Sequence, residues 1–329
     1  MAPASRLVSG VRGPGAEQLR MLAKVARMYH EQGMRQPEIA AQLNISQPRV
    51  SRLLKEATTR GIVRTVVVLP PGVHTELEER LQQRYGLRDA VVVDTDGSNG
   101  DVIPALGAAA AVYLDATLKG GDVIGISSWS ETLLAAVDAM HPKHTSVADR
   151  VVQIVGGVGS PEAQVQATRL TGRLAEITGA RPVFVPSPGL VGTPAIRRAL
   201  TQDDAVAAVM AQWKELTVAL VGIGSLEPSP LLLQSGNAVA EADQDELRGL
   251  GAVGDVCLRF FDDHGRPVKS RLDQRVIGIT SADLRTIERR VAVAGGARKL
   301  SAIRAALLND WVNVLITDVN TAERLIASE

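Results

Sequence analysis

The 329-residue sequence predicts a small N-terminal unit built of helices, followed by a large α/β unit with a mainly parallel sheet. Residues 17–60 place apolar side chains at helical spacing. From residue 90 onward, short runs rich in Val and Ile alternate with helical segments, as expected when parallel strands are buried on both faces. The stiff sequence Pro70-Pro71-Gly72 separates the two patterns and indicates a domain boundary.

The N-terminal unit contains the pattern of a helix-turn-helix. After a first helix over about residues 17–32, the segment QPEIAAQLNISQPRVSRLL predicts two short helices joined by a tight turn. Asn44 tolerates the left-handed backbone of such a turn, Ser46 is a good N-cap, and Pro48 fits a first helical turn. The expected core consists of Ile39, Ala40, Leu43, Ile45, Val50, Leu53 and Leu54. An ordinary surface hairpin is the weaker interpretation, because these signals agree with one another.

Charge indicates a polyanionic partner for this unit alone. The whole chain is neutral, yet residues 1–69 carry a net charge of +7, from 11 Lys and Arg against four Glu. The second helix of the motif, expected over residues 47–60, exposes side chains suited to base edges and phosphates: Gln47, Arg49, Ser51, Arg52 and Lys55. A strand over 62–69 would form a wing, from which Arg64 could touch a phosphate. We therefore expect a double-stranded DNA operator, and a homo-oligomer, dimer or tetramer, because one head covers only a short half-site.

The expected domains are a disordered basic tail at 1–15, a winged helix-turn-helix at 16–69, a hinge at 70–73 and an effector and oligomerisation domain at 74–329. No apolar run approaches the ~20 residues of a transmembrane helix, and residues 1–15 lack a signal core. The single Cys257 excludes an internal disulfide and is expected to be buried. These features predict a cytoplasmic protein with no metal, no cofactor and no membrane contact.

The large unit is expected to alternate strands and helices. Strands are predicted at 90–93, 123–126, 151–155, 182–185, 218–221, 255–261, 276–279, 290–294 and 314–317. Helices are predicted at 103–118, 131–140, 162–178, 203–213, 282–288, 297–307 and 321–327.

Several of these strands end in turns rich in Gly or hydroxyl groups, at 125–130, 156–160, 222–225 and 295–296. Ligands of open α/β sheets bind at the carboxyl ends of strands, and helix N-termini bind phosphate. Ser127, Ser128 and Ser130 would add hydroxyl donors. Any one turn is better explained by a tight connection, whereas the whole set favours a phosphorylated or hydroxyl-rich small ligand.

Asp255 and Lys299 stand at the edges of such turns, where contact with a ligand and plain solvent exposure are about equally expected. Arg259 and Asp262 are weaker candidates in the same region. The sequence Gly249-Leu-Gly251-Ala-Val-Gly254 matches GxGxxG, but it follows a helical pattern and precedes a strand, so a dinucleotide site is rejected. Neither GxxxxGK[ST] nor GxSxG occurs.

The chain resembles the SorC family of bacterial sugar-binding transcriptional regulators. The matching segments are SQPRVSRLLKEATTRGIVR, VIGISSWSETL, VVQIVGGVG, LVGIGS, GAVGDVCLRFFDDHGRPV, VAVAGGARKLSAIRAAL and VNVLITDVNTAERLI. The resemblance implies a fold similar to sugar-phosphate isomerases and glucosamine-6-phosphate deaminase, and a tetramer switched by a phosphorylated sugar or polyol. It places the phosphate loop on Ser127, Ser128, Trp129 and Ser130, the acid on Asp255 and the lysine on Lys299. With the turn residues Gly125, Gly156 and Gly157, these complete the expected effector site.

The leading hypothesis is thus a ligand-controlled regulator of a carbohydrate-metabolism operon with no catalytic residues. A sugar-phosphate isomerase or deaminase with a nucleic-acid-binding module is the alternative. Enolisation needs a placed base and an acid partner, and no His lies in the Gly-rich turns. A DNA-binding architectural protein with a degenerate effector domain is a third, weaker hypothesis.

Overall fold

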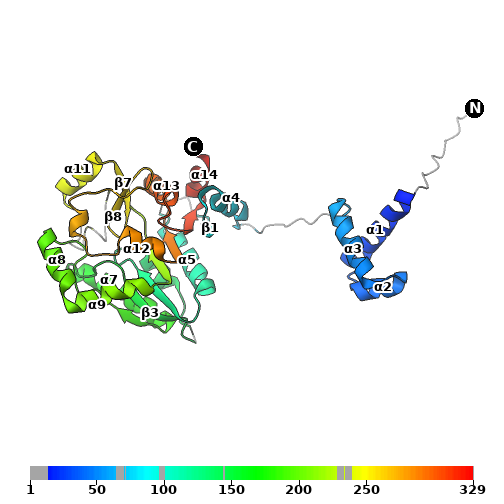
Figure 1. Cartoon of the computed structure of the whole chain (residues 1–329), viewed down its shortest axis with the longest axis horizontal. Helices are drawn as coiled ribbons and strands as arrows, with labels where there is room; N and C mark the ends of the chain where they lie inside the picture. The colour runs from blue at the N-terminus through cyan, green and yellow to red at the C-terminus, as the bar shows by residue number, and fades with distance from the viewer. Residues whose placement is uncertain are drawn as a thin grey trace, which may run out of the picture. The chain divides into compact units, whose positions relative to one another are not determined.

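A computed structural model describes residues 14–63, 70, 72–95, 101–143, 145–227, 233 and 239–328 (Figure 1). The chain divides into two compact units, Met1–Leu69 and Pro70–Glu329. The predicted tail up to residue 13, the predicted strand at 64–69 and Arg64 itself lie outside the described residues.

Within residues 14–63, the first unit contains three helices, α1 (Pro14–His30), α2 (Gln36–Leu43) and α3 (Gln47–Thr59). Asn44 has the predicted left-handed backbone, with φ 50° and ψ 47°, and ends α2. Ser46 occupies the N-cap position of α3 in an extended conformation, but its side chain makes no capping hydrogen bond. The core contains the apolar residues that the sequence predicted, with Val25 and Met28 of α1 packed among Ile39, Ala40, Val50 and Leu54. Helical spacing therefore predicted these three helices and their core correctly.

The second unit is built on a parallel sheet in the order β1-β10-β9-β5-β2-β3-β4. The strands are β1 (Asp89–Val93), β2 (Asp122–Ile126), β3 (Ala148–Gln153), β4 (Arg181–Val183), β5 (Val218–Val221), β9 (Arg289–Val293) and β10 (Val314–Asp318). Every pairing in this sheet is parallel. The α/β fold class is confirmed, because continuous Val and Ile runs do form strands buried on both faces.

Helices flank this sheet. They are α4 (Thr75–Tyr85), α5 (Ile103–Thr117), α6 (Glu131–Ala139), α7 (Pro161–Thr178), α8 (Pro194–Gln202), α9 (Asp204–Gln212), α11 (Glu241–Gly249), α12 (Ser281–Thr286), α13 (Leu300–Leu308) and α14 (Val319–Ala327), with 3-10 turns at Trp213–Glu215, Asp273–Arg275 and Ala297–Lys299. Helices α4 and α8 were not predicted. Leu81 is the one fully buried residue of α4 and α8 buries none, so neither helix offers the run of apolar core residues from which the other helices were predicted.

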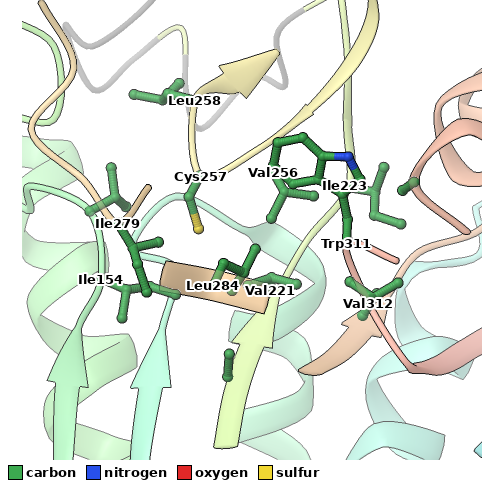
Figure 2. Packing of buried hydrophobic residues seen from close by; sticks show 14 of the residues in the cluster. Ile154, Val221, Ile223, Val256, Cys257, Leu258, Ile279, Leu284, Trp311 and Val312 are labelled. Atoms are coloured by element: carbon green, nitrogen blue, oxygen red, sulfur yellow. The ribbon is translucent and has the colours of Figure 1, made fainter. Parts of the chain in front are cut away.

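The predicted strand at 255–261 is wrong. It is the hairpin of β7 (Ala252–Val256) and β8 (Arg259–Asp262), which with β6 (Gly224–Ser225) forms a small antiparallel sheet. The two turn residues, Cys257 and Leu258, have φ values of 54° and 62°. Two-residue hairpin turns normally use Asn or Gly at such positions, so an apolar Cys-Leu pair carries no turn signal. Figure 2 shows this turn over a buried cluster that includes Ile154, Val221, Ile279 and Leu284.

The predicted strand at 276–279 is also wrong. Val276 and Gly278 make only isolated bridges, to Leu190 and to Val155. The backbone of Ile277 is hydrogen-bonded to Gly189 on one side and to Gly156 on the other, but these contacts do not form a continuous ladder. Cys257 is buried and free, as predicted. Among the described residues, every helix is too short or too polar to cross a membrane.

Candidate functional sites

Helix α3 exposes a basic surface. Gln47, Arg49, Ser51, Arg52 and Lys55 are all exposed, while Val50 and Leu54 on the opposite side are buried. Within residues 14–63, the ion pairs are Arg27–Glu31 and Arg60–Glu56. The charges of Arg49, Arg52 and Lys55 are therefore not neutralised by acids of their own unit. The Arg52 Nε–H donates a hydrogen bond to the carbonyl oxygen of Pro48 at 3.3 Å, which orients this side chain.

The second unit contains a cavity of about 410 Å³. It lies at the carboxyl ends of β2, β5 and β9, whose following residues Ser127, Gly222 and Gly295 all line it. The hairpin residues Asp255, Cys257 and Leu258 form another part of its wall. This is the edge of a parallel sheet where ligands of α/β proteins bind.

The loop after β2 contributes to the cavity in a way that the sequence did not resolve. Ser127, Trp129 and Ser130 line it, but Ser128 does not. The buried Ser128 hydroxyl donates to the carbonyl oxygen of Val155 at 3.0 Å, and the Trp129 indole N–H donates to that of Gly156 at 3.0 Å. The Ser130 side chain caps α6 by accepting from the Leu133 N–H at 3.2 Å. Three of the four predicted side chains, those of Ser128, Trp129 and Ser130, thus hold the loop in place through hydrogen bonds to neighbouring backbone.

The three predicted glycines serve packing. A Cβ at Gly125 would lie 2.7 Å from Ile154, one at Gly156 would lie 2.3 Å from the backbone of Pro188, and one at Gly157 would lie 2.5 Å from Gln153. None of the three lines the cavity. At these three positions, neighbouring atoms leave no room for a side chain, which explains the glycines without a role in ligand binding.

Asp255 and Lys299, which are far apart in the sequence, both line the cavity and are partly buried. Burial raises the pKa of Asp255 to about 6, although its carboxylate accepts the Leu258 N–H and faces the charge of Lys299. Burial lowers the pKa of Lys299, which the charges of Asp255 and Glu131 oppose. The cavity therefore holds one acceptor and one cation that a hydroxyl-rich anion could use.

The sequence missed several lining residues, namely Asp101, Thr132, Glu227 and Arg298. Gly224 and Ser225 also line the cavity and belong to the predicted turn at 222–225. Glu131 lines it directly after the predicted phosphate loop. Glu227 and Arg298 face one another, with 3.8 Å between Oε2 and Nη2. The ionisable lining is thus more acidic than expected, with Asp101, Glu131, Glu227 and Asp255 against Arg298 and Lys299.

The weaker candidates lie elsewhere. The buried Arg259 guanidinium binds the carbonyl oxygens of Gly278 and Ile279 and the carboxylate of Asp273, so it fixes the hairpin. Asp262 accepts hydrogen bonds from Arg266, and neither Arg259 nor Asp262 lines the cavity.

Comparison with known proteins identifies the class of both units. The family described as "Putative sugar-binding domain" matches residues 70–327, and the family described as "Homeodomain-like domain" matches residues 16–65. The chain is 33% identical to the deoxyribonucleoside regulator of Bacillus subtilis over 311 residues, covering 94% of this chain and 98% of that protein. It is 32% identical to the sorbitol operon regulator of Klebsiella pneumoniae, covering 94% and 99%.

The fold agrees with that relationship. The crystal structure of the full-length sorbitol operon regulator SorC from Klebsiella pneumoniae matches with a TM-score of 0.71, covering 94% of this chain and 98% of that one. The protein is therefore a transcriptional regulator with an N-terminal helix-turn-helix and a large ligand-binding α/β unit. It belongs to the SorC family.

Proposed function

We propose that this chain regulates a carbohydrate-metabolism operon in the cytoplasm, and that a small sugar or polyol bound in the cavity switches its affinity for DNA. The observation that carries the proposal is the meeting of Asp255 and Lys299 in one cavity at the carboxyl edge of the sheet. The relatives are regulators named for sorbitol and deoxyribonucleoside, which supports a carbohydrate ligand here.

The effector is proposed to contact Ser127, Trp129, Ser130, Asp255 and Lys299. Asp255 would accept sugar hydroxyls, while Lys299 and the backbone N–H groups at the start of α6 would hold a phosphate. Such a phosphate would approach Glu131, the first residue of α6, which also lines the cavity. Binding of a phosphorylated effector therefore depends on Lys299 more strongly than binding of a neutral polyol does.

The operator is proposed to bind along α3. Arg49, Arg52 and Lys55 supply charge, and Gln47 and Ser51 supply donors and acceptors for base edges. Because a single head reads only a short half-site, we propose a homo-oligomer, either a dimer or a tetramer. In this proposal residues 16–69 bind DNA, residues 70–73 form a hinge, and residues 74–329 bind the effector and form the contacts between subunits.

We propose that the protein is not an enzyme. One observation favours the isomerase or deaminase alternative, namely the raised pKa of Asp255, which suits a general base. However, one oxygen of that carboxylate already accepts the Leu258 N–H at 2.9 Å. A turnover assay with sugar phosphates separates the alternatives, because product formation lost in Asp255→Asn would establish catalysis.

The test of the main proposal uses matched pairs of candidate effectors: sorbitol and sorbitol 6-phosphate, erythritol and erythritol 4-phosphate, and deoxyribose and deoxyribose 5-phosphate. A bound compound raises the melting temperature, with a stabilisation of about 2.7 kcal/mol at about 100 times Kd. The compound that does so is then titrated against protein and operator DNA. If none of a wider carbohydrate panel stabilises the protein, the effector is of another class.

Lys299→Ala tests the site itself. We expect this variant to lose the effector's influence on DNA affinity while its effector-free DNA binding stays normal, because the two sites are distinct and coupled. Lys214→Ala, which removes an exposed lysine of the same unit, is the matched control. A normal effector response in Lys299→Ala would remove this lysine from the site, and weakened DNA binding without effector would indicate a role in folding.

A further inference from the structure

The cavity loop Gly295–Lys299 is fastened to the beginning of α14 by two buried side chains. The Gly296 N–H donates to Asp318 Oδ2 at 2.8 Å and to Thr321 Oγ1 at 2.9 Å. The Thr321 hydroxyl in turn donates to Asp318 Oδ2 at 2.7 Å, and the Thr321 N–H donates to Oδ1 at 2.9 Å. Both side chains are 2% exposed.

This arrangement determines where the loop lies. A Cβ at Gly295 would be 2.3 Å from Asp318 Oδ2, so the loop backbone rests directly against the carboxylate. The same loop carries Arg298 and Lys299 into the cavity wall, whereas Asp318 and Thr321 do not line the cavity. A shift of the loop on ligand binding must therefore strain these hydrogen bonds or move the start of α14 with it.

The other end of α14 contacts α4, and Figure 1 shows these two helices side by side. The Tyr85 hydroxyl at the end of α4 donates to the carbonyl oxygen of Leu325 at 2.8 Å, and Arg84 donates to that of Ser328. Strand β1, which follows α4, pairs with β10 so that Val93 lies opposite Asp318. Helix α4 is thus connected to both ends of α14.

We propose that Asp318 and Thr321 are positioning residues that transmit the state of the cavity loop through α14 to α4. Helix α14 has nine residues and spans about 13 Å, short enough to move as one rigid body. In the sequence, α4 is the first helix after the segment that joins the second unit to the helix-turn-helix. A displacement of α4 therefore acts on the part of the second unit that comes directly after the DNA-binding unit and the joining segment in the chain.

Hydrogen–deuterium exchange of the full-length, effector-free protein tests this coupling from both ends. Thr321→Val keeps the side-chain shape and removes the hydroxyl, which accepts from the Gly296 N–H and donates to Asp318. We expect hydrogen exchange of the segment with Gly296 to become at least about five times faster, because the Gly296 N–H itself loses one hydrogen bond. Coupling predicts faster exchange in α4 as well, and recovery of both segments in Thr321→Ser. At the α4 end of the proposed route, Tyr85→Phe removes the hydrogen bond to Leu325. It should speed hydrogen exchange in α4 and in the segment with Gly296.

Thr201→Val is the matched control, because its hydroxyl donates to Arg197 within α8 and lies outside the proposed route. It should leave both segments unchanged. If Thr321 has a purely local role, Thr321→Val will speed hydrogen exchange only in the segment with Gly296 and not in α4. This result, together with unchanged exchange of that segment in Tyr85→Phe, would overturn the proposal. If Thr321→Val does not fold, Tyr85→Phe decides alone: a quickened loop supports the coupling and an unchanged loop refutes it.

Discussion

Asp255→Asn is expected to stabilise the second unit at neutral pH and to abolish its response to effector. Burial raises the pKa of this carboxyl from an ordinary value of 3.8 to about 6. Between these values the folded protein binds more protons than the unfolded chain. The free energy of unfolding therefore falls as pH rises through this window and remains lower above it. Asparagine carries no charge, so the free energy of unfolding of the variant should not fall in this way as pH rises.

The size of the effect follows from the shift. About two pKa units correspond to about 3 kcal/mol, and the partial exposure of the side chain to the cavity reduces the expected gain to about 2 kcal/mol. The asparagine carbonyl can still accept the Leu258 N–H, which supports a turn with two left-handed residues. Asp255→Ala loses that acceptor as well, and left-handed residues cost about 1–2 kcal/mol each, so it should gain less or be destabilised.

Urea unfolding between pH 4.5 and 7.5, followed by tryptophan fluorescence, measures this directly. All three tryptophans, Trp129, Trp213 and Trp311, belong to the second unit, so the signal reports that unit alone. Wild type should lose stability as pH rises towards 6, and Asp255→Asn should exceed it by about 2 kcal/mol at pH 7.5. A variant that is less stable than wild type at pH 7.5, or that keeps the same pH slope, would refute the reasoning.

Two further predictions concern DNA and assembly. Arg49→Ala and Arg52→Ala should each weaken specific operator binding in matched salt, by about 1–3 kcal/mol if the arginine contacts a base in bidentate fashion. Arg27→Ala, on α1 and paired with Glu31, is the control, and unchanged binding by both α3 variants would remove α3 from the DNA interface. Light scattering should show an oligomer free and on DNA, because paired half-sites require paired heads. A monomer in both conditions contradicts this prediction.

Local sequence determined most of the secondary structure. In the helix-turn-helix, the apolar spacing of Val50 and Leu54, and the tolerance of Asn44 for a left-handed backbone, are properties of neighbouring residues. The parallel strands were recognisable for the same reason, because a strand buried on both faces must be apolar throughout. Where the signal depended on few buried residues, as in α4 and α8, the prediction failed.

The composition of the proposed effector site was only partly predictable. The Gly-rich and hydroxyl-rich turns indicated the right edge of the sheet, since the carboxyl ends of parallel strands converge there. Asp255 and Lys299 do meet in the cavity, although the sequence favoured contact and exposure equally. The direction of each hydroxyl was not predictable, and Ser128 turns into the interior while Ser127 faces the cavity.

What only the tertiary structure decided are the contacts between residues distant in the chain. Asp255 and the buried cluster beneath the turn hold the backbone at Cys257 and Leu258. Because these contacts replace turn-forming residues, the sequence at this point is apolar and resembles a continuous strand. Glu227 enters the cavity beside Arg298, and Asp318 and Thr321 reach the loop at Gly296, 22 and 25 residues earlier in the chain. Helical and strand periodicity records which face of an element is buried, whereas the partner on that face is set by the packing of the whole unit.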